Sequence, residues 1–278
     1  MKKGEIYEGV VERIDFPNKG RVHVEGETVT VKNAIPGQKI RFQINKKRKN
    51  RMEGRLLEVT EKSPMEKRDP VCSIFPSCGG CMYQTMSYEE QLKMKETQVK
   101  GLLQEAVGIG TDLHWEGIHG SPIEFGYRNK MEFSFGDEYK DGPLALGLHK
   151  RNSMYDIVPV TECKIIDEDY RKILTCVQDY AIEKELPFQH KLSHEGYLRH
   201  LLVRKSVKTG QILVDIVTTT QIEHDFTELV NRLTSIEYNG TLTGVLHTFN
   251  DSLADAVINE KTELLYCLLY TSPSPRDS

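Results

Sequence analysis

The sequence lacks the segments that carry a chain into or across a membrane. No apolar run approaches the roughly 18 residues that a spanning helix needs. The first five residues hold two lysines and a glutamate, where a secretory signal would have an apolar core. Internal repeats are also absent. We therefore expect a cytoplasmic, monomeric protein with no membrane partner.

The chain as a whole has no large excess of positive or negative charge. Its N-terminal 70 residues, however, differ in charge from the rest. Residues 1–70 contain 17 Lys and Arg against 11 Asp and Glu, a net charge of +6. The remainder has 20 and 30, a net charge of −10, which gives the total of −4. A small basic module is thus joined to an acidic body. Basic modules of this kind indicate a nucleic-acid partner, because Lys and Arg displace counterions from phosphates.

The basic module has the pattern of a small barrel. Residues 4–59 alternate in short apolar and polar runs, separated by turn residues such as Pro17 and the pair Pro36 and Gly37. Four or five strands in about 60 residues predict a closed all-β barrel of the oligonucleotide-binding type over residues 1–62.

A run of cations lies between two of these strands. Such a run is often only a solvated loop. Its position on a candidate oligonucleotide-binding barrel favours contact with RNA phosphates. The candidate RNA-binding residues of this run are Lys46, Lys47, Arg48, Lys49 and Arg51.

Residues 63–265 predict a second domain of the α+β class. A polar linker with prolines covers residues 63–70, and a helix follows over 87–107, with Ser87 as N-cap and Glu90 completing a capping box. We expect helices over 168–183 and near 226–233 and a hairpin over 198–219. Strands are expected over 130–135, 144–148 and 242–249. Strands and helices without regular alternation are typical of α+β folds. In the helix over 87–107, the apolar positions expected to face a core are Leu92, Val99, Leu102, Leu103 and Ala106.

Three cysteines lie within ten residues, at Cys72, Cys78 and Cys81. Thiols stay reduced in the cytoplasm, so the cluster indicates metal or redox chemistry more than disulfides. Gly79 and Gly80 remove side chains where the backbone must curl around a ligand. Four thiolates complete either a zinc tetrahedron or a [4Fe–4S] cube, and the spacing leaves both open.

The fourth ligand has three candidates. Cys163 stands at the end of a predicted strand and just before a helix, a common place for a metal ligand. Cys176 lies on an apolar helical face, where a buried structural thiol is expected. Cys267 lies near a Ser- and Pro-containing end, residues 266–278, that we expect to be a non-native or disordered tail.

Taken together, these motifs resemble the bacterial 23S rRNA (uracil-5-)-methyltransferases and their tRNA-modifying relatives. The similarity runs from about residue 4 to residue 265 in the family's order. The matching pieces are Gly9 to Val11 and Ala34 to Gly37 of a TRAM-type barrel, the C-x5-C-G-G-C motif at Cys72, the segments 127–133 and 156–163, and the hairpin from Leu198 to Arg204.

The resemblance implies a [4Fe–4S] cluster on Cys72, Cys78, Cys81 and Cys163. It also implies that Arg128 and Lys130, with Arg199 as a weaker candidate, hold RNA. Such cations can equally be solvated or paired, with Glu132 or Asp156 for example, and exposed pairs of this kind contribute little.

The resemblance further implies a C-terminal doubly wound domain that binds S-adenosylmethionine and supplies a cysteine nucleophile against uracil C6. Gly108 and Gly110 lack the third glycine of a nucleotide fingerprint, and Cys267 has no base beside it. We therefore assign no catalytic and no cofactor-binding residue. We expect a fragment without its catalytic domain, inactive alone, whose 87–107 helix packs on that missing domain.

The function expected from the resemblance is S-adenosylmethionine-dependent methylation of uracil C5 in RNA, in 23S rRNA rather than tRNA. The alternative is a free-standing RNA-binding iron–sulfur module without catalysis. A radical enzyme that cleaves S-adenosylmethionine is disfavoured, because such enzymes usually space their cysteines as C-x3-C-x2-C.

Overall fold

The structure, a computed structural model, describes residues 1–48, 51–108, 110, 112, 114–254 and 256–268. It divides into two compact units. The first comprises Met1–Val71 and Met82–Pro122, and the second Cys72–Cys81 and Ile123–Ser278. This differs from the predicted boundary after residue 62, because residues 82–122 group with the barrel and the cysteine loop groups with the larger unit.

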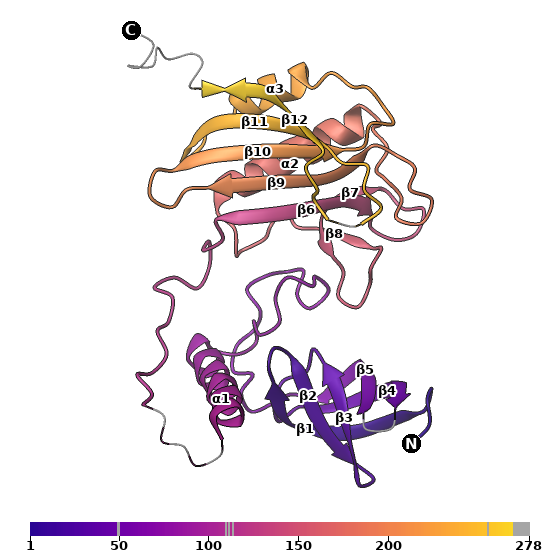
Figure 1. Cartoon of the computed structure of the whole chain (residues 1–278), viewed down its shortest axis with the longest axis vertical. Coiled ribbons are helices and arrows are strands. Elements are labelled where there is room, and N and C mark those ends of the chain that lie inside the picture. Colours follow the sequence, from indigo (N-terminus) through magenta and orange to yellow (C-terminus); the bar gives the residue numbers. More distant parts are fainter. Residues whose placement is uncertain (49–50, 109, 111, 113, 255, 269–278) are drawn as a thin grey trace. The chain divides into compact units, whose positions relative to one another are not determined.

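The first unit contains a closed barrel of five strands in the order β1-β2-β3-β5-β4, with β1 also paired to β4 (Figure 1). All pairs are antiparallel except β3 with β5, which run parallel. Alternate side chains such as Val22, Ile40 and Phe42 are fully buried inside it. The strands are β1 (Ile6–Asp15), β2 (Lys19–Val24), β3 (Glu27–Lys32), β4 (Lys39–Arg48) and β5 (Arg51–Glu61).

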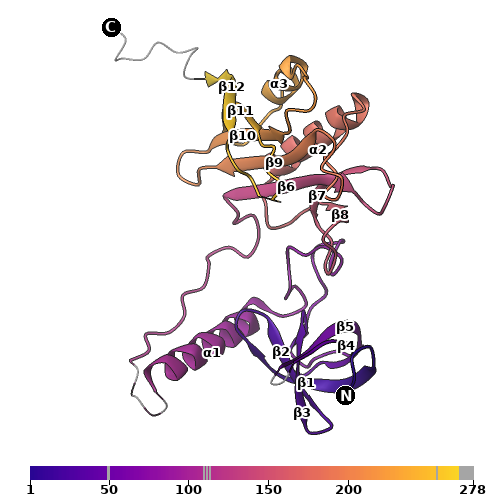
Figure 2. The same cartoon turned by 45° about the vertical axis from the view of Figure 1, so that its right-hand side comes forward.

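A helix, α1 (Tyr88–Val107), belongs to the same unit and lies beside the barrel (Figure 2). It begins as predicted, with the Glu90 backbone N–H donating to Ser87 Oγ at 3.3 Å. Met94 is buried in the apolar cluster of the barrel, and Gln98 Nε2 donates to the Ile14 carbonyl at 3.2 Å.

The predicted apolar face of this helix is not buried within this unit. Val99, Leu102 and Leu103 are 38%, 45% and 39% exposed, Ala106 is exposed, and Leu92 is only half-buried. Helical periodicity shows that apolar residues share a face, but it does not say which face meets the neighbouring element. Here the side of the helix that carries Met94 is the buried one.

The second unit is built on a seven-stranded sheet of order β12-β11-β10-β9-β6-β7-β8. Its strands pair antiparallel except β10 with β11, which run parallel and are connected through α3. The elements are β6 (Lys130–Asp137), β7 (Leu144–His149), β8 (Ile157–Pro159), α2 (Glu168–Glu183), β9 (Leu198–Lys205), β10 (Gln211–Thr218), α3 (Thr227–Thr234), β11 (Thr241–Phe249) and β12 (Lys261–Cys267).

The core of this unit lies between the sheet and α2 with α3, which cover one face of the sheet (Figure 2). The predicted inward residues of α2 are buried: Ile173, Leu174, Val177 and Ala181. At the edge of the sheet, Tyr266 and Cys267 pair with β11, so the expected tail does not begin at residue 266. Residues 269–278 of that expected tail lie outside the described residues.

Candidate cysteine centre and nucleic-acid surfaces

The loop Cys72–Cys81 is folded on itself and attached to the turn after β7. The Ser77 backbone N–H donates to the Ile74 carbonyl at 2.8 Å, which tightens the loop between the first two cysteines. Gly79 N–H donates to the His149 carbonyl at 2.9 Å. Arg151 adds two hydrogen bonds: its backbone N–H donates to the Ser77 carbonyl at 2.7 Å, and its guanidinium donates to the Cys81 carbonyl. The cysteine loop is therefore held by backbone groups of the second unit.

Both glycines of the motif stand where a side chain would be crowded. A Cβ on Gly79 would lie 3.0 Å from the His149 carbonyl oxygen, tighter than nearly all real contacts. A Cβ on Gly80 would lie 3.0 Å from Leu148 Cδ1 and 3.5 Å from Cys78 Sγ. Instead, the Gly80 backbone N–H points at Cys78 Sγ at 3.4 Å. The backbone thus approaches the thiols closely, as a bulky ligand on them would require.

Cys163 joins this region from the connection between β8 and α2. It is 7% exposed and belongs to the apolar core, against which Cys78 and Cys81 also pack. Its backbone N–H donates to the Val160 carbonyl at 2.9 Å, and Arg171 donates to its carbonyl at 3.2 Å. The position predicted for a fourth ligand is therefore beside the loop that carries the other three.

The thiols influence one another electrostatically. Burial raises the pKa of the Cys78 thiol, and the neighbouring Cys81 and Cys72 raise it further. Burial likewise raises the pKa of Cys163, with Cys81 and Cys78 adding to the effect. Thiols with raised pKa stay protonated near neutral pH, so thiolates here need a positive ligand to stabilise them.

The four cysteines match a metal cluster in donor chemistry only. None of them is joined in a disulfide in the described part of the chain. Their sulfurs are not gathered at metal-ligating distance, and no group of three or more Cys, His, Asp or Glu among the described residues forms such a site. Cys176 lies on α2 near Arg232 and Asp179, and Cys267 ends β12.

Arg128 lies next to the Cys163 segment, and Lys130 begins the strand that follows. The Arg128 backbone N–H donates to the Ile165 carbonyl at 3.1 Å, two residues beyond Cys163. Its guanidinium carbon is 5.9 Å from the Tyr127 ring centroid. Lys130 Nζ is 3.6 Å from Glu132, a partly exposed pair that leaves the ammonium accessible. Both cations are therefore exposed, and Arg128 lies beside the segment that carries Cys163.

Arg199 has a different environment from the one expected on a hairpin face. Arg199 is only 6% exposed. The guanidinium donates to the backbone carbonyls of Asn250, Ser252 and Ala254 at 2.6, 2.8 and 2.8 Å. These hydrogen bonds order the segment after β11, so the structure gives Arg199 a role in holding the backbone.

The basic run predicted from the sequence lies at the β4–β5 end of the barrel. Lys46 and Arg51 are 65% and 61% exposed and both face Glu53, at 3.6 and 2.7 Å. Lys47 Nζ donates to the Met1 carbonyl at 2.9 Å, and Arg48 is exposed. Lys49 lies outside the described residues. Four exposed cations with one shared carboxylate leave a positive surface at this end of the barrel.

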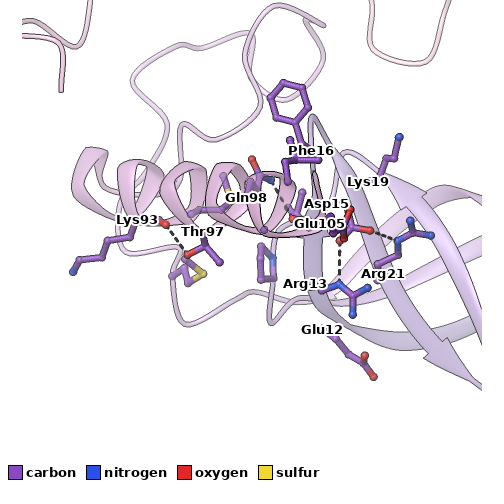
Figure 3. A pocket seen from close by; sticks show the side chains of 16 residues that line it. Glu12, Arg13, Asp15, Phe16, Lys19, Arg21, Lys93, Thr97, Gln98 and Glu105 are labelled. Carbon is purple, nitrogen blue, oxygen red and sulfur yellow. Dashed lines mark hydrogen bonds and ion pairs between the residues drawn. The ribbon is translucent and has the colours of Figure 1, made fainter. Parts of the chain in front are cut away.

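A second surface of the first unit was not predicted from the sequence. A groove of about 810 Å³ lies between the end of β1 and α1 (Figure 3). Asp15 sits in it between two arginines, 3.0 Å from Arg13 Nε and 2.6 Å from Arg21 Nε. Burial alone would raise the pKa of Asp15, but the hydrogen bonds from Arg21 and Arg13 hold it below its ordinary value. In the sequence, this region is recognisable only as a turn at Pro17.

No protein-family model matches the chain. Curated relatives do match it. One from Caldanaerobacter subterraneus subsp. tengcongensis, named an uncharacterized RNA methyltransferase, is 48% identical over 266 residues, 96% of this chain and 58% of that protein. Another of that name, from Clostridium tetani, is 44% identical with the same coverage. Over most of its length, the chain is therefore similar to proteins named as RNA methyltransferases.

The fold is shared with a solved enzyme. The structure of Pyrococcus abyssi tRNA (uracil-54, C5)-methyltransferase in complex with S-adenosyl-L-homocysteine matches with a TM-score of 0.64, at 21% identity, over 92% of this chain and 55% of that chain. The chain therefore spans somewhat more than half the length of the proteins it matches.

The comparisons correct the predicted fold class. The sequence predicts a fragment defined by a missing methyltransferase domain. Instead, 96% of the chain aligns with RNA methyltransferases and 92% of it with a solved uracil methyltransferase fold. We therefore withdraw the description of the chain as an inactive fragment. Within the described part of the chain, no helix combines the length and apolarity needed to cross a membrane.

Proposed function

We propose that this chain acts in the S-adenosylmethionine-dependent methylation of uracil C5 in RNA. The observation that carries the proposal is the 48% identity to an RNA methyltransferase over 96% of the chain. The solved neighbour, whose title names tRNA uracil-54 and S-adenosyl-L-homocysteine, supports the choice of base and of methyl donor. S-adenosylmethionine supplies the methyl group.

The residues of the first unit bind RNA in this proposal. Lys46, Lys47, Arg48 and Arg51 form an exposed cationic end of the barrel, where phosphates replace the solvent around them. Lys49, in the same run, is included on its sequence position alone. Because these cations meet the backbone of RNA, they position the substrate without reading its sequence.

The cysteines of the second unit hold a [4Fe–4S] cluster in this proposal, on Cys72, Cys78, Cys81 and Cys163. Three of these thiols pack on one apolar core, and Cys72 acts electrostatically on Cys78, which supports this ligand set. The cluster ties the loop to the segment between β8 and α2. Arg128, which stands beside that segment, and the exposed Lys130 contact RNA phosphates. Arg199 instead orders the segment after β11.

As the target RNA, we favour 23S rRNA over tRNA. The experiment deletes the gene in its host and measures 5-methyluridine by mass spectrometry in purified 23S rRNA and tRNA. We expect one 5-methyluridine to disappear from 23S rRNA and to return on complementation. Loss from tRNA alone would redirect the proposal to tRNA. Unchanged 5-methyluridine in both RNAs would refute uracil C5 methylation as the function.

A further inference from the structure

We propose that Arg151 is a positioning residue for the cysteine loop Cys72–Cys81. It holds the backbone of this loop in one conformation, so that the thiols stand ready for the cluster of the proposed function. The inference rests on that proposed cluster for its purpose. The contacts that carry it join the loop to the turn between β7 and β8. Arg151 acts through the loop, since ligation itself is left to the cysteines.

Arg151 contacts the loop at three separate places. Its backbone N–H donates to the Ser77 carbonyl at 2.7 Å, and its guanidinium donates to the Cys81 carbonyl. The guanidinium carbon also lies 5.4 Å from the centroid of the Phe75 ring. These contacts are spread over residues 75–81, which include the last two cysteines of the motif. One residue therefore fixes the loop both at its middle and at its end.

An arginine suits these contacts better than a lysine does. The planar guanidinium can lie over the half-buried Phe75 ring while its N–H groups donate to a carbonyl. A lysine ammonium carries the same charge but lacks the planar fork. The charge of Arg151 also acts on the Cys78 thiol. Because four thiolates around iron bring negative charge to the loop, a cation held beside them stabilises the loaded loop.

The turn that carries Arg151 is itself fixed. The Lys150 backbone N–H donates to the Asp156 carbonyl at 2.9 Å, and the Ser153 N–H donates to the Lys150 carbonyl at 3.0 Å. Ser153 Oγ accepts a hydrogen bond from the Asp156 N–H at 3.1 Å. An antiparallel bridge between Cys78 and Lys150 joins the cysteine loop to this turn. Arg151 therefore meets the loop from a closed turn with a defined backbone.

The same hairpin leads to the fourth cysteine. β7 and β8 pair antiparallel at one edge of the sheet (Figure 1). Cys163 comes four residues after Pro159, the last residue of β8. Arg151 thus holds the loop with three cysteines on the hairpin that leads into the segment with the fourth. A loop that is already ordered on this hairpin loses less conformational entropy when four sulfurs bind one cluster.

The test first follows hydrogen exchange by mass spectrometry in the full chain after metal has been removed with a chelator. Arg151→Met should raise the exchange rates of the amides of residues 72–81 roughly tenfold, because a charged hydrogen bond is lost. The amides of β9 and β10 should exchange as in the wild type. Arg151→Lys keeps the charge and should restore part of the protection. Lys150→Met is the control, because this neighbouring cation faces Asp156 at 3.7 Å, and it should leave the loop unchanged.

The second measurement follows the loss of iron to a chelator from the anaerobically reconstituted chain, by the decay of its visible absorbance. Arg151→Met should lose iron roughly tenfold faster than the wild type, with Arg151→Lys between them, because residues that orient metal ligands govern metal retention. A wild-type chain that takes up no iron refutes the proposed cluster, and the exchange experiment still decides whether Arg151 orders the loop.

Three results overturn the positioning role of Arg151 and leave the proposed cluster standing. The first is wild-type exchange across residues 72–81 in Arg151→Met. The second is an equal effect in Arg151→Met and Lys150→Met. The third is iron release at the wild-type rate from Arg151→Met.

Discussion

At the scale of single residues, Lys205 forms a largely buried ionic contact with two aspartates of the second unit. Its ammonium lies 2.5 Å from Asp167 and 2.7 Å from Asp169, whose side chain is fully buried. Removing one partner of a buried pair leaves the other charge uncompensated. We expect Lys205→Met to lower the free energy of unfolding by roughly 3 kcal/mol, measured by urea denaturation. Lys208→Met, at an exposed position, is the control, and an equal small loss in both variants would contradict this account.

Asp169 also makes stability depend on pH. Burial by itself would raise its pKa, but the hydrogen bonds from Lys205 and from the backbone N–H groups of Asn239 and Gly240 hold the pKa below its ordinary value. A carboxyl whose pKa is lowered by folding stabilises the protein above its unfolded pKa, and that contribution is lost as the pH falls through the folded value.

Asp169→Asn should therefore flatten the decline of stability below about pH 4, near the unfolded pKa of an aspartate. The measurement is the free energy of unfolding at a series of acidic pH values, compared as a slope with the wild type. The comparison of slopes is insensitive to the overall stability that the substitution removes. Parallel curves would show that another carboxyl governs the acid transition.

At the scale of elements, the cations at the β4–β5 end of the barrel are proposed to bind RNA phosphates, and substitutions there test this. Changing Lys46, Lys47, Arg48 and Arg51 together to glutamine should weaken RNA binding and reduce the salt slope by about 0.7 for each phosphate that is no longer neutralised. A matched variant changes four other exposed lysines of the same unit: Lys2, Lys3, Lys32 and Lys62. It should keep most of the slope. Equal slopes in both variants would mean that the run is only a solvated loop.

Local elements could be predicted because their signals are local. α2 has the predicted bounds, since an apolar face and the acidic first turn lie within one run, with Asp167 as its N-cap. The hairpin of β9 and β10 was also predicted, around a Gly210 with positive φ. The parallel pair of β10 and β11 was not predicted, because such pairing depends on a crossover connection and on distant partners.

The candidate site could be predicted only where its residues are close in sequence. Cys72, Cys78 and Cys81 are recognisable by their spacing. Cys163 could be predicted only from its position between a strand and a helix and from the family pattern. Arg199 looked like an exposed cation, because the carbonyls to which it donates come 51 or more residues later. The groove beside α1 had no sequence signal, since β1 and the helix are separated by more than 70 residues.

At the scale of the whole molecule, the basic charge and the cysteines lie in different units. The barrel unit carries the cationic run, and the sheet unit holds all six cysteines. The loop Cys72–Cys81 belongs to the second unit although the segments on both sides of it belong to the first. A cluster on these cysteines would be bonded to the loop three times and to Cys163 once, and so would fix the loop to the rest of the second unit.

The most direct measurement is the iron content of the anaerobically reconstituted chain and of two cysteine variants. We predict about four irons per wild-type chain, the same content in Cys176→Ala, and loss of the iron in Cys163→Ala. The account is contradicted by stoichiometric zinc without iron in the wild type. It is equally contradicted by a Cys163→Ala chain that retains the full iron content.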